Sequence, residues 1–138
     1  MTEGQNLPAG RTEVVKDTHT LMLRVLPMPG DINANGHIFG GWVLSQMDIA
    51  GGVMASRVAK GRCATVAIES MEFMAPILLH DLISVYARVA RRGRTSVAIA
   101  IDVFASRRGS ESDVHVTSGV FTFVALDDDF RPRPLSPE

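Results

Sequence analysis

The sequence is poor in cysteine, in long apolar runs and in excess charge of either sign. Its single cysteine, Cys63, cannot form an intrachain disulfide, and together with the four histidines it shows no metal-ligand spacing. Fourteen basic and fifteen acidic side chains leave a net charge of −1, which argues against a general nucleic-acid binder. No stretch approaches the roughly 20 apolar residues of a membrane span, and residues 1–16 lack the apolar core of a signal peptide. We therefore expect a reduced, cytoplasmic protein.

The length of 138 residues fits one domain with a sizeable core. Residues 1–19 carry glycine, proline, asparagine and charge without periodicity, which predicts a flexible N-terminal arm. Residues 131–138 are rich in proline and predict a short C-terminal tail. The folded domain should therefore span residues 20–130.

Hydrophobic patterns predict one long helix and a set of strands. Residues 41–60 form an almost entirely apolar helical stretch that Gly61 should end, and a helix apolar all round is normally buried. Strands are predicted over residues 20–26, 65–73, 81–90, 94–104 and 114–126. Short polar connections favour consecutive antiparallel hairpins among the last four. The predicted fold class is α+β, with one curved antiparallel sheet wrapped around a single long helix.

Alternation within the strands predicts which side chains share a face. In the last strand Val114, Val116, Val120 and Val124 should lie on one face, and the two strands before it show equally apolar faces. Glu69 and Glu72 are separated by an odd number of residues. We therefore expect them on opposite faces, so that only one could address the helix.

The strongest chemical pattern runs from Asp31 to Gly52. Turn-forming residues lead through the paired glycines Gly40 and Gly41 into the helix. Glycines at a helix entry let a ligand approach the free N–H groups of the first turn, which favour developing negative charge. The pattern predicts an oxyanion site at the start of the helix.

Asp48 is the first candidate for a catalytic side chain. A carboxylate within an apolar helix costs several kcal/mol if it is buried without a partner, so Asp48 must face solvent, a partner or a cleft. It lies two turns into the helix, beyond the range of the helix dipole. Offsets of four, seven and eleven residues from Gly41 place Ser45, Asp48 and Gly52 on one helix face.

Other polar residues carry weaker patterns. Asn33 precedes the helix in a loop, where asparagine usually stabilises turns. His37 could act as a base, although the sequence identifies no carboxylate to orient it. The chain contains no nucleophile elbow, phosphate-binding loop or dinucleotide fingerprint to support a role for the remaining nucleophilic side chains, which are Ser45, Ser56 and Cys63.

A basic turn is the second candidate site. Three arginines surround a glycine and two hydroxyl residues follow, in the order Arg91, Arg92, Gly93, Arg94, Thr95 and Ser96. Such a group could hold a phosphate through bidentate contacts. A solvated hairpin turn explains the same residues equally well.

Several of these segments together resemble the hotdog-fold acyl-CoA thioesterases, specifically the YciA-like group. The similarity covers roughly residues 20–135, through Asn33-Ala-Asn-Gly, Phe39-Gly-Gly-Trp, Ser45-Gln-Met-Asp, Glu69-Ser-Met-Glu-Phe and Gly93-Arg-Thr-Ser. The resemblance implies a long helix wrapped by an antiparallel sheet, sheet-to-sheet dimers with active sites at the subunit interface, and commonly a hexameric trimer of such dimers.

The resemblance also implies roles for individual residues. Asp48 would be the catalytic carboxylate, and Asn33 of the partner subunit would orient the attacking water or the substrate. The N–H groups of Gly40 and Gly41 would polarise the thioester carbonyl. The basic turn of residues 91–96 would receive the coenzyme A phosphates. The reaction would need no metal or other cofactor, since coenzyme A is part of the substrate.

Two alternatives remain open at the level of sequence. A hydratase or dehydratase acting on acyl thioesters could use the same fold, with His37 as a catalytic histidine. A non-catalytic acyl-CoA sensor is the other possibility, although no additional effector segment is evident within the 138 residues.

Overall fold

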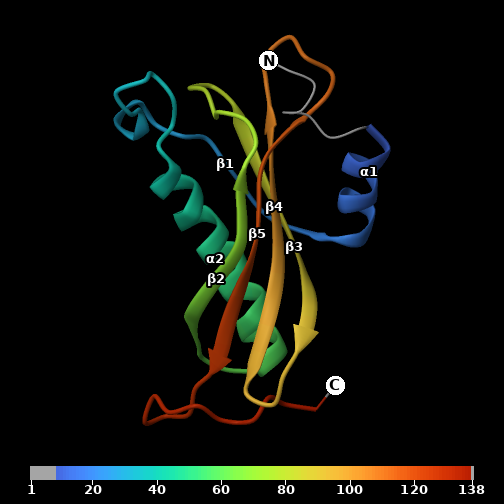
Figure 1. Ribbon diagram of the computed structural model, residues 1–138, viewed down its shortest axis with the longest axis vertical. Coiled ribbons are helices and arrows are strands. Elements are labelled where there is room, and N and C mark those ends of the chain that lie inside the picture. Colours follow the sequence, from blue (N-terminus) through green and yellow to red (C-terminus); the bar gives the residue numbers. More distant parts are fainter. Residues whose placement is uncertain (1–8, 138) are drawn as a thin grey trace.

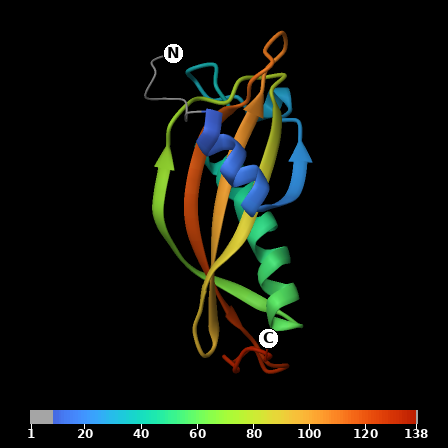
Figure 2. The ribbon, with the colours of Figure 1, turned by 90° about the vertical axis from the view of Figure 1, so that its right-hand side faces the viewer.

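The computed structural model describes residues 9–137. One antiparallel sheet is formed by β1 (Thr20–Val25), β2 (Cys63–Phe73), β3 (Leu82–Arg92), β4 (Ser96–Ser106) and β5 (Val114–Ala125). The long helix α2 (Gly40–Ala59) packs on one face of this sheet, and a shorter helix, α1 (Ala9–Thr18), lies across the other (Figures 1 and 2). A 3₁₀ turn, η2 (Pro29–Asp31), precedes α2. The predicted α+β class with a single long helix against an antiparallel sheet is confirmed.

The order of the strands in the sheet is β1-β3-β4-β5-β2. The β3–β4 and β4–β5 hairpins are those expected from the sequence. The expected hairpin between β2 and β3 is wrong, because β2 pairs with β5 at the far edge. Residues 74–81 connect the two strands, a length that can cross the three strand spacings, about 14 Å, that separate them.

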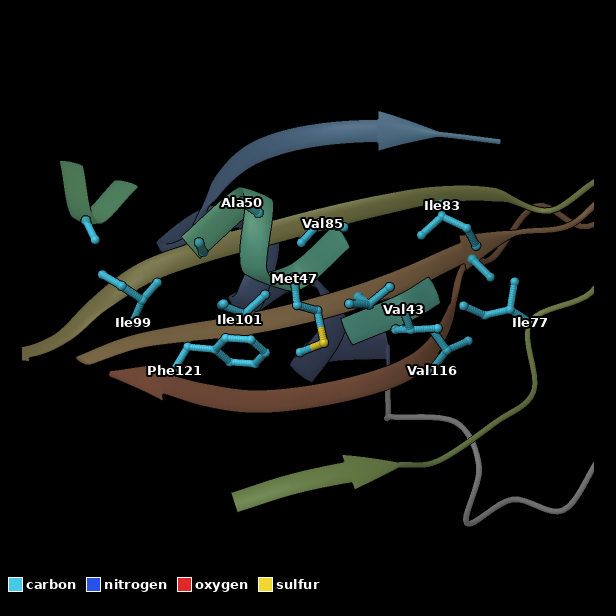
Figure 3. Packing of buried hydrophobic residues seen from close by; sticks show 14 of the residues in the cluster. Val43, Met47, Ala50, Ile77, Ile83, Val85, Ile99, Ile101, Val116 and Phe121 are labelled. Carbon is cyan, nitrogen blue, oxygen red and sulfur yellow. The ribbon is translucent and has the colours of Figure 1, made fainter. Parts of the chain in front are cut away.

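The core lies between α2 and the sheet. The predicted apolar faces of β3 and β4 are confirmed, since Ile83 and Val85 of β3 and Ile99 and Ile101 of β4 are fully buried there. Met47 of α2 projects toward these strands at the centre of the cluster (Figure 3). Only one side of α2 is buried within this chain, so the expectation of a helix wrapped all round is wrong for a single subunit.

A bulge in β5 changes the predicted face of its C-terminal half. Val103 pairs with Thr117 and Phe104 with His115, so Val116 is the extra residue. After it, Phe121 and Phe123 enter the core. Val120 and Val124 therefore lie on the other face, contrary to the alternation predicted from sequence.

A second irregularity, in β2, affects the two glutamates. The pairing of β2 with β5 shifts between Glu69 and Glu72, where Ser70 has a positive φ of 54°. Glu69 is opposite Val120 and Glu72 opposite Ser118, residues that line the face away from α2. Both glutamates thus face away from the helix, so the prediction of opposite faces is wrong.

The end of α2 is capped by the C-terminal segment. Lys60, rather than the expected Gly61, adopts the left-handed conformation that ends the helix, with φ 55°. Arg133 Nη2 donates a hydrogen bond to Ala59 O at 2.8 Å, and Ser136 Oγ donates to the same carbonyl at 3.2 Å. A Cβ on Gly61 would lie 2.7 Å from Arg133 Nη2, so a larger residue there requires the guanidinium that caps α2 to shift.

Helix α1 corrects the expectation of a flexible arm over residues 1–19; the first eight of these lie outside the described residues. Val15 is buried against Tyr86 and Phe104 on the sheet face opposite α2. Lys16 forms an ion pair with Asp113. The helix is therefore stabilised by tertiary contacts, which its own weakly periodic sequence does not reveal.

Asp102 of β4 contacts two histidines, His115 of β5 and His19, which directly follows α1. Its carboxylate accepts hydrogen bonds from His115 Nε2 at 2.8 Å and lies 3.2 Å from His19 Nε2. Burial alone would raise the pKa of this carboxyl, but the hydrogen bonds and charges of His115 and His19 outweigh it and lower the pKa from 3.8 to about 2.

We expect acid to weaken the protein through Asp102. Because the folded-state pKa lies below the unfolded value, the carboxylate contributes stability above about pH 4, which is lost as the pH falls toward 2. The loss is about 2 kcal/mol at 1.36 kcal/mol per pKa unit. Urea unfolding across this pH range measures it. Asp102→Asn should be less stable at neutral pH and should show a shallower acid dependence; an unchanged acid dependence would contradict the assignment.

Candidate active site

Asp48 lies on the exposed side of α2 and is held by a neighbour on β2. Thr65 Oγ1 donates a hydrogen bond of 2.6 Å to Asp48 Oδ1. Both side chains line an open cavity of about 570 Å³, together with Ile49, Val53 and Phe123. One carboxylate oxygen is thus fixed by the threonine, while Oδ2 accepts no hydrogen bond from residues 9–137. Asp48 therefore faces a cleft. This agrees with the prediction from sequence, since burying a carboxylate without a partner costs free energy.

Thr65 is the contact that sequence reasoning missed. It belongs to a strand whose edge position and register were not predicted. No spacing in the sequence relates a residue on β2 to one on α2, 17 positions earlier.

The start of α2 presents the predicted free amides. Phe39 occupies the N-cap position without a side-chain cap. Within residues 9–137, the N–H groups of Gly40 and Gly41 have no hydrogen-bond acceptor. Unpaired N–H groups at the first turn of a 20-residue helix are suited to bind a carbonyl oxygen that gains negative charge.

The loop before α2 is organised by Asn33. Its Oδ1 accepts hydrogen bonds from the N–H groups of Asn35 at 2.9 Å and His37 at 3.1 Å. Gly36, with φ +80°, completes this tight turn. The side-chain oxygen of Asn33 already accepts two hydrogen bonds within the loop. Only the side-chain N–H groups of Asn33 are therefore available to bind a substrate or water.

Asn33 and Asp48 line different cavities of the same chain. Asn33 lines a cavity of about 300 Å³ at the start of α2, with His37, Gly40 and Phe73. Asp48 lines the larger cavity beside β2. A single subunit therefore does not bring these two candidate residues together.

The basic turn between β3 and β4 is not a single cluster of three arginines. Arg91 forms an exposed ion pair with Glu69 at 2.8 Å, on the sheet face away from α2. Arg92 donates to the carbonyl oxygen of Ser136 in the C-terminal segment. The side chain of Arg94 makes no hydrogen bond or ion pair with the described part of the chain.

The rest of the turn has structural contacts. Gly93 N–H donates to Ser96 O at 2.8 Å, and Thr95 O accepts from Ala125 N–H. A Cβ on Gly93 would lie 2.7 Å from Ser96 Oγ, so a larger residue there requires the serine hydroxyl to rotate. The turn lies at the end of the molecule where α2 ends, far from the start of α2 (Figure 1).

Of the other candidate nucleophiles, Ser56 and Cys63 line the same cavity as Asp48, whereas Ser45 does not. Ser45 Oγ donates to Gly41 O at 3.0 Å, as serine commonly does within a helix. Burial raises the pKa of the Cys63 thiol, although the charge of Arg133 and a hydrogen bond with Ser56 act in the opposite direction. A protonated thiol is a weak nucleophile.

His37 lacks an orienting partner. Its side chain makes no hydrogen bond or ion pair with residues 9–137. It shares its cavity with no carboxylate.

Residues 9–137 contain neither a cluster of metal-binding side chains nor a membrane-spanning helix. In the part of the chain that the structure describes, no cluster of three or more His, Cys, Asp or Glu side chains could hold a metal ion. No helix within residues 9–137 is long and apolar enough to cross a membrane.

Comparisons with known proteins bear on this arrangement. Residues 35–112 match the model of the Thioesterase superfamily. The chain is 44% identical over 138 residues to the acyl-CoA thioester hydrolase YciA of Salmonella typhimurium, covering 98% of this chain and 97% of that protein. The hexameric thioesterase y2039 from Yersinia pestis is 40% identical, with a TM-score of 0.81 over 96% of this chain and 100% of that one.

A third relative is HI0827, described as a hexameric broad specificity acyl-coenzyme A thioesterase. The structure of one of its aspartate-to-alanine mutants superimposes with a TM-score of 0.82 at 44% identity, over 86% of this chain and 88% of that one. A long helix packed against a curved antiparallel sheet, as shared with these structures, defines a hotdog-fold protein. The chain belongs to the thioesterase superfamily, and the resemblance to its YciA-like group is confirmed.

Proposed function

We propose that this chain hydrolyses acyl-CoA thioesters to a free carboxylic acid and coenzyme A. The observation that carries the proposal is the Asp48 carboxylate, fixed by Thr65 in an open cavity on the exposed side of α2. The relatives named acyl-CoA thioester hydrolase supply the substrate class. A thioester carbonyl is already electrophilic, so a positioned water, a base and an oxyanion site suffice for hydrolysis.

Asp48 would act through its free Oδ2. As a general base, it takes a proton from water while the water oxygen bonds to the thioester carbon. The carbonyl oxygen gains negative charge and accepts hydrogen bonds from the N–H groups of Gly40 and Gly41 of the neighbouring subunit, because Gly40 lines the cavity of Asn33 and not that of Asp48. The C–S bond then breaks, and the sulfur of coenzyme A leaves with a proton. Direct attack by the carboxylate, which would form an anhydride that water then opens, is the alternative route.

Asn33 would act as a hydrogen-bond donor. Its Oδ1 is occupied by the loop, so its amide N–H is the group that can hold the attacking water or the substrate. This role requires a neighbouring subunit to bring Asn33 near Asp48. The hydratase alternative loses support, because His37 has no carboxylate to orient it.

Release of thiol from a panel of acyl-CoA thioesters tests the proposed function. Steady turnover with at least one chain length supports it. Binding of acyl-CoA without thiol release would support the sensor alternative, and hydration of an unsaturated acyl-CoA without thiol release would support the hydratase alternative.

We also propose that the active unit is a dimer, assembled further into a hexamer as in the relatives described as hexameric. β2 is an edge strand with one open side, and Val66 and Ile68 on it are 58% and 47% exposed. Ile49 of α2 is 55% exposed beside it. An open strand edge next to apolar side chains favours pairing with a second copy of the chain.

Complementation between two inactive variants tests the shared site. Asp48→Asn and Asn33→Ala subunits should each be inactive alone. A mixed dimer contains one intact site, so random exchange should restore about a quarter of the wild-type activity. Light scattering checks the assembly and its exchange. A stable, fully active monomer, or exchange without recovery of activity, would contradict a site built from two subunits.

The basic turn of residues 91–96 is proposed to receive the phosphates of coenzyme A, with Arg94 as its available cation. Arg94→Ala should raise KM about tenfold for short and long acyl-CoA alike, because a phosphate contact does not sense the acyl chain. Arg91→Ala is the matched control, since Arg91 is already paired with Glu69. On an acyl-pantetheine thioester, which lacks the nucleotide phosphates, Arg94→Ala should match the wild type. Equal impairment on both substrates would make the turn purely structural.

A further inference from the structure

Two adjacent glycines near the middle of α2 have different surroundings. A Cβ on Gly51 would lie 2.8 Å from Ile101 Cδ1 and 2.9 Å from Phe123 Cζ, so close packing of the helix on the sheet explains this glycine. A Cβ on Gly52 would meet only Phe123 Cε2, at the ordinary contact distance of 3.8 Å. Nothing in the described chain therefore prevents a side chain at Gly52.

The absence of a side chain at Gly52 needs another reason. Gly52 lies inside a regular helix, where glycine is less favourable than alanine and no positive φ calls for it. It lines the same cavity as Asp48 and Thr65. Asp48 precedes it by four residues and thus lies one turn away on the same face. A side chain at Gly52 would occupy the space next to the candidate carboxylate.

The cavity has polar and apolar walls, and its polar side chains are Asp48, Ser56, Arg57, Cys63 and Thr65. Ile49, Val53 and Phe123 border Gly52 and offer no side-chain hydrogen-bond donor or acceptor. The pantetheine arm of coenzyme A carries two amides that need such partners, whereas a hydrocarbon chain does not. The apolar wall formed by Ile49, Val53 and Phe123 therefore suits the acyl part of the substrate.

We propose that Gly52 determines which acyl chains the enzyme accepts, by leaving room for the first carbons beyond the thioester carbonyl. The inference rests on the proposed function. Bulk added at Gly52 should exclude long or branched acyl groups more strongly than short ones. Removing volume from the neighbouring wall, as in Val53→Ala, should favour long or branched acyl groups over short ones.

The test compares kcat/KM for octanoyl-CoA and for acetyl-CoA in the oligomeric wild type, Gly52→Ala, Gly52→Val and Val53→Ala. The ratio of octanoyl to acetyl should fall about tenfold or more in Gly52→Ala and further in Gly52→Val, since one methylene in an apolar pocket changes selectivity by that order. The ratio should rise in Val53→Ala. Gly52→Ala should also raise the Tm by a few degrees, because alanine favours the helix.

Other outcomes would overturn the inference in recognisable ways. An equal loss for all chain lengths would assign the space to coenzyme A. A lower Tm or dissociation of the oligomer in Gly52→Ala would assign it to contact between subunits. A wild type that releases no thiol from any acyl-CoA would refute the proposed function itself, whereas wild-type turnover with unchanged ratios in the variants refutes only the role of Gly52.

Discussion

Asp48→Asn should lower kcat by at least about 100-fold while leaving the fold intact, since a general base contributes 10² to 10⁴ in rate. Asparagine has nearly the same shape and can still accept the hydrogen bond from Thr65, but it cannot take a proton or attack as a carboxylate. Thiol release under saturating substrate gives the change in kcat. Thermal unfolding of the variant shows that the protein remains folded.

Two neighbouring variants sharpen this experiment. Ser45→Ala removes a hydroxyl from the same helix face that is bonded only to Gly41 O, and it should keep near wild-type turnover. Thr65→Val keeps the carboxylate but removes its hydrogen-bond donor, so it should lower kcat less than Asp48→Asn does, with Thr65→Ser restoring most of the loss. Near wild-type turnover in Asp48→Asn would remove Asp48 from the chemistry.

Gly51→Val should destabilise the protein by about 2–3 kcal/mol, the usual effect of forcing extra volume into a packed core. The new Cβ would lie within 3.0 Å of Ile101 and Phe123 atoms, and both of these side chains are almost fully buried, so neither can swing into solvent. Urea unfolding measures the loss.

Gly52→Ala is the matched control for this substitution, because its Cβ meets only an ordinary contact one residue further along the same helix. Equal stability of Gly51→Val and the wild type would mean that α2 can shift away from the sheet without penalty. In that case the position of Asp48 would not depend on Gly51.

The sequence was informative where local pattern decides the structure. α2 begins and ends within one residue of the predicted limits, since its apolar run, entry glycines and C-terminal stop are all local signals. The apolar faces of β3 and β4 were also correct, because both strands alternate regularly where they face the helix. The same local reasoning identified the free amides at Gly40 and Gly41 as a candidate oxyanion site.

The sequence was uninformative where distant parts of the chain decide the structure. The bulge at Val116 depends on the pairing of β5 with β4, so simple alternation misplaced Val120 and Val124. Helix α1 depends on the apolar surface that Tyr86 and Phe104 offer to Val15. Thr65 meets Asp48 only because β2 occupies the edge beside β5.

The three arginines of the basic turn show the same limit. Their spacing suggested one phosphate-binding site. In the structure, Arg91 instead forms an ion pair with Glu69, and Arg92 donates a hydrogen bond to the C-terminal segment. Neither partner can be inferred from the turn itself.

The position of β2 has a consequence for how the chain folds. β2 is followed directly by β3, yet its only partner in the sheet is β5, which ends at Ala125. During synthesis β2 must therefore remain unpaired until nearly the whole chain has left the ribosome. Closing this long-range pairing is an entropically late step, and the unpaired backbone of β2 is available for wrong association until it happens. The strand that carries Thr65 should thus be among the last elements to reach its native place, which makes the candidate site a late product of folding.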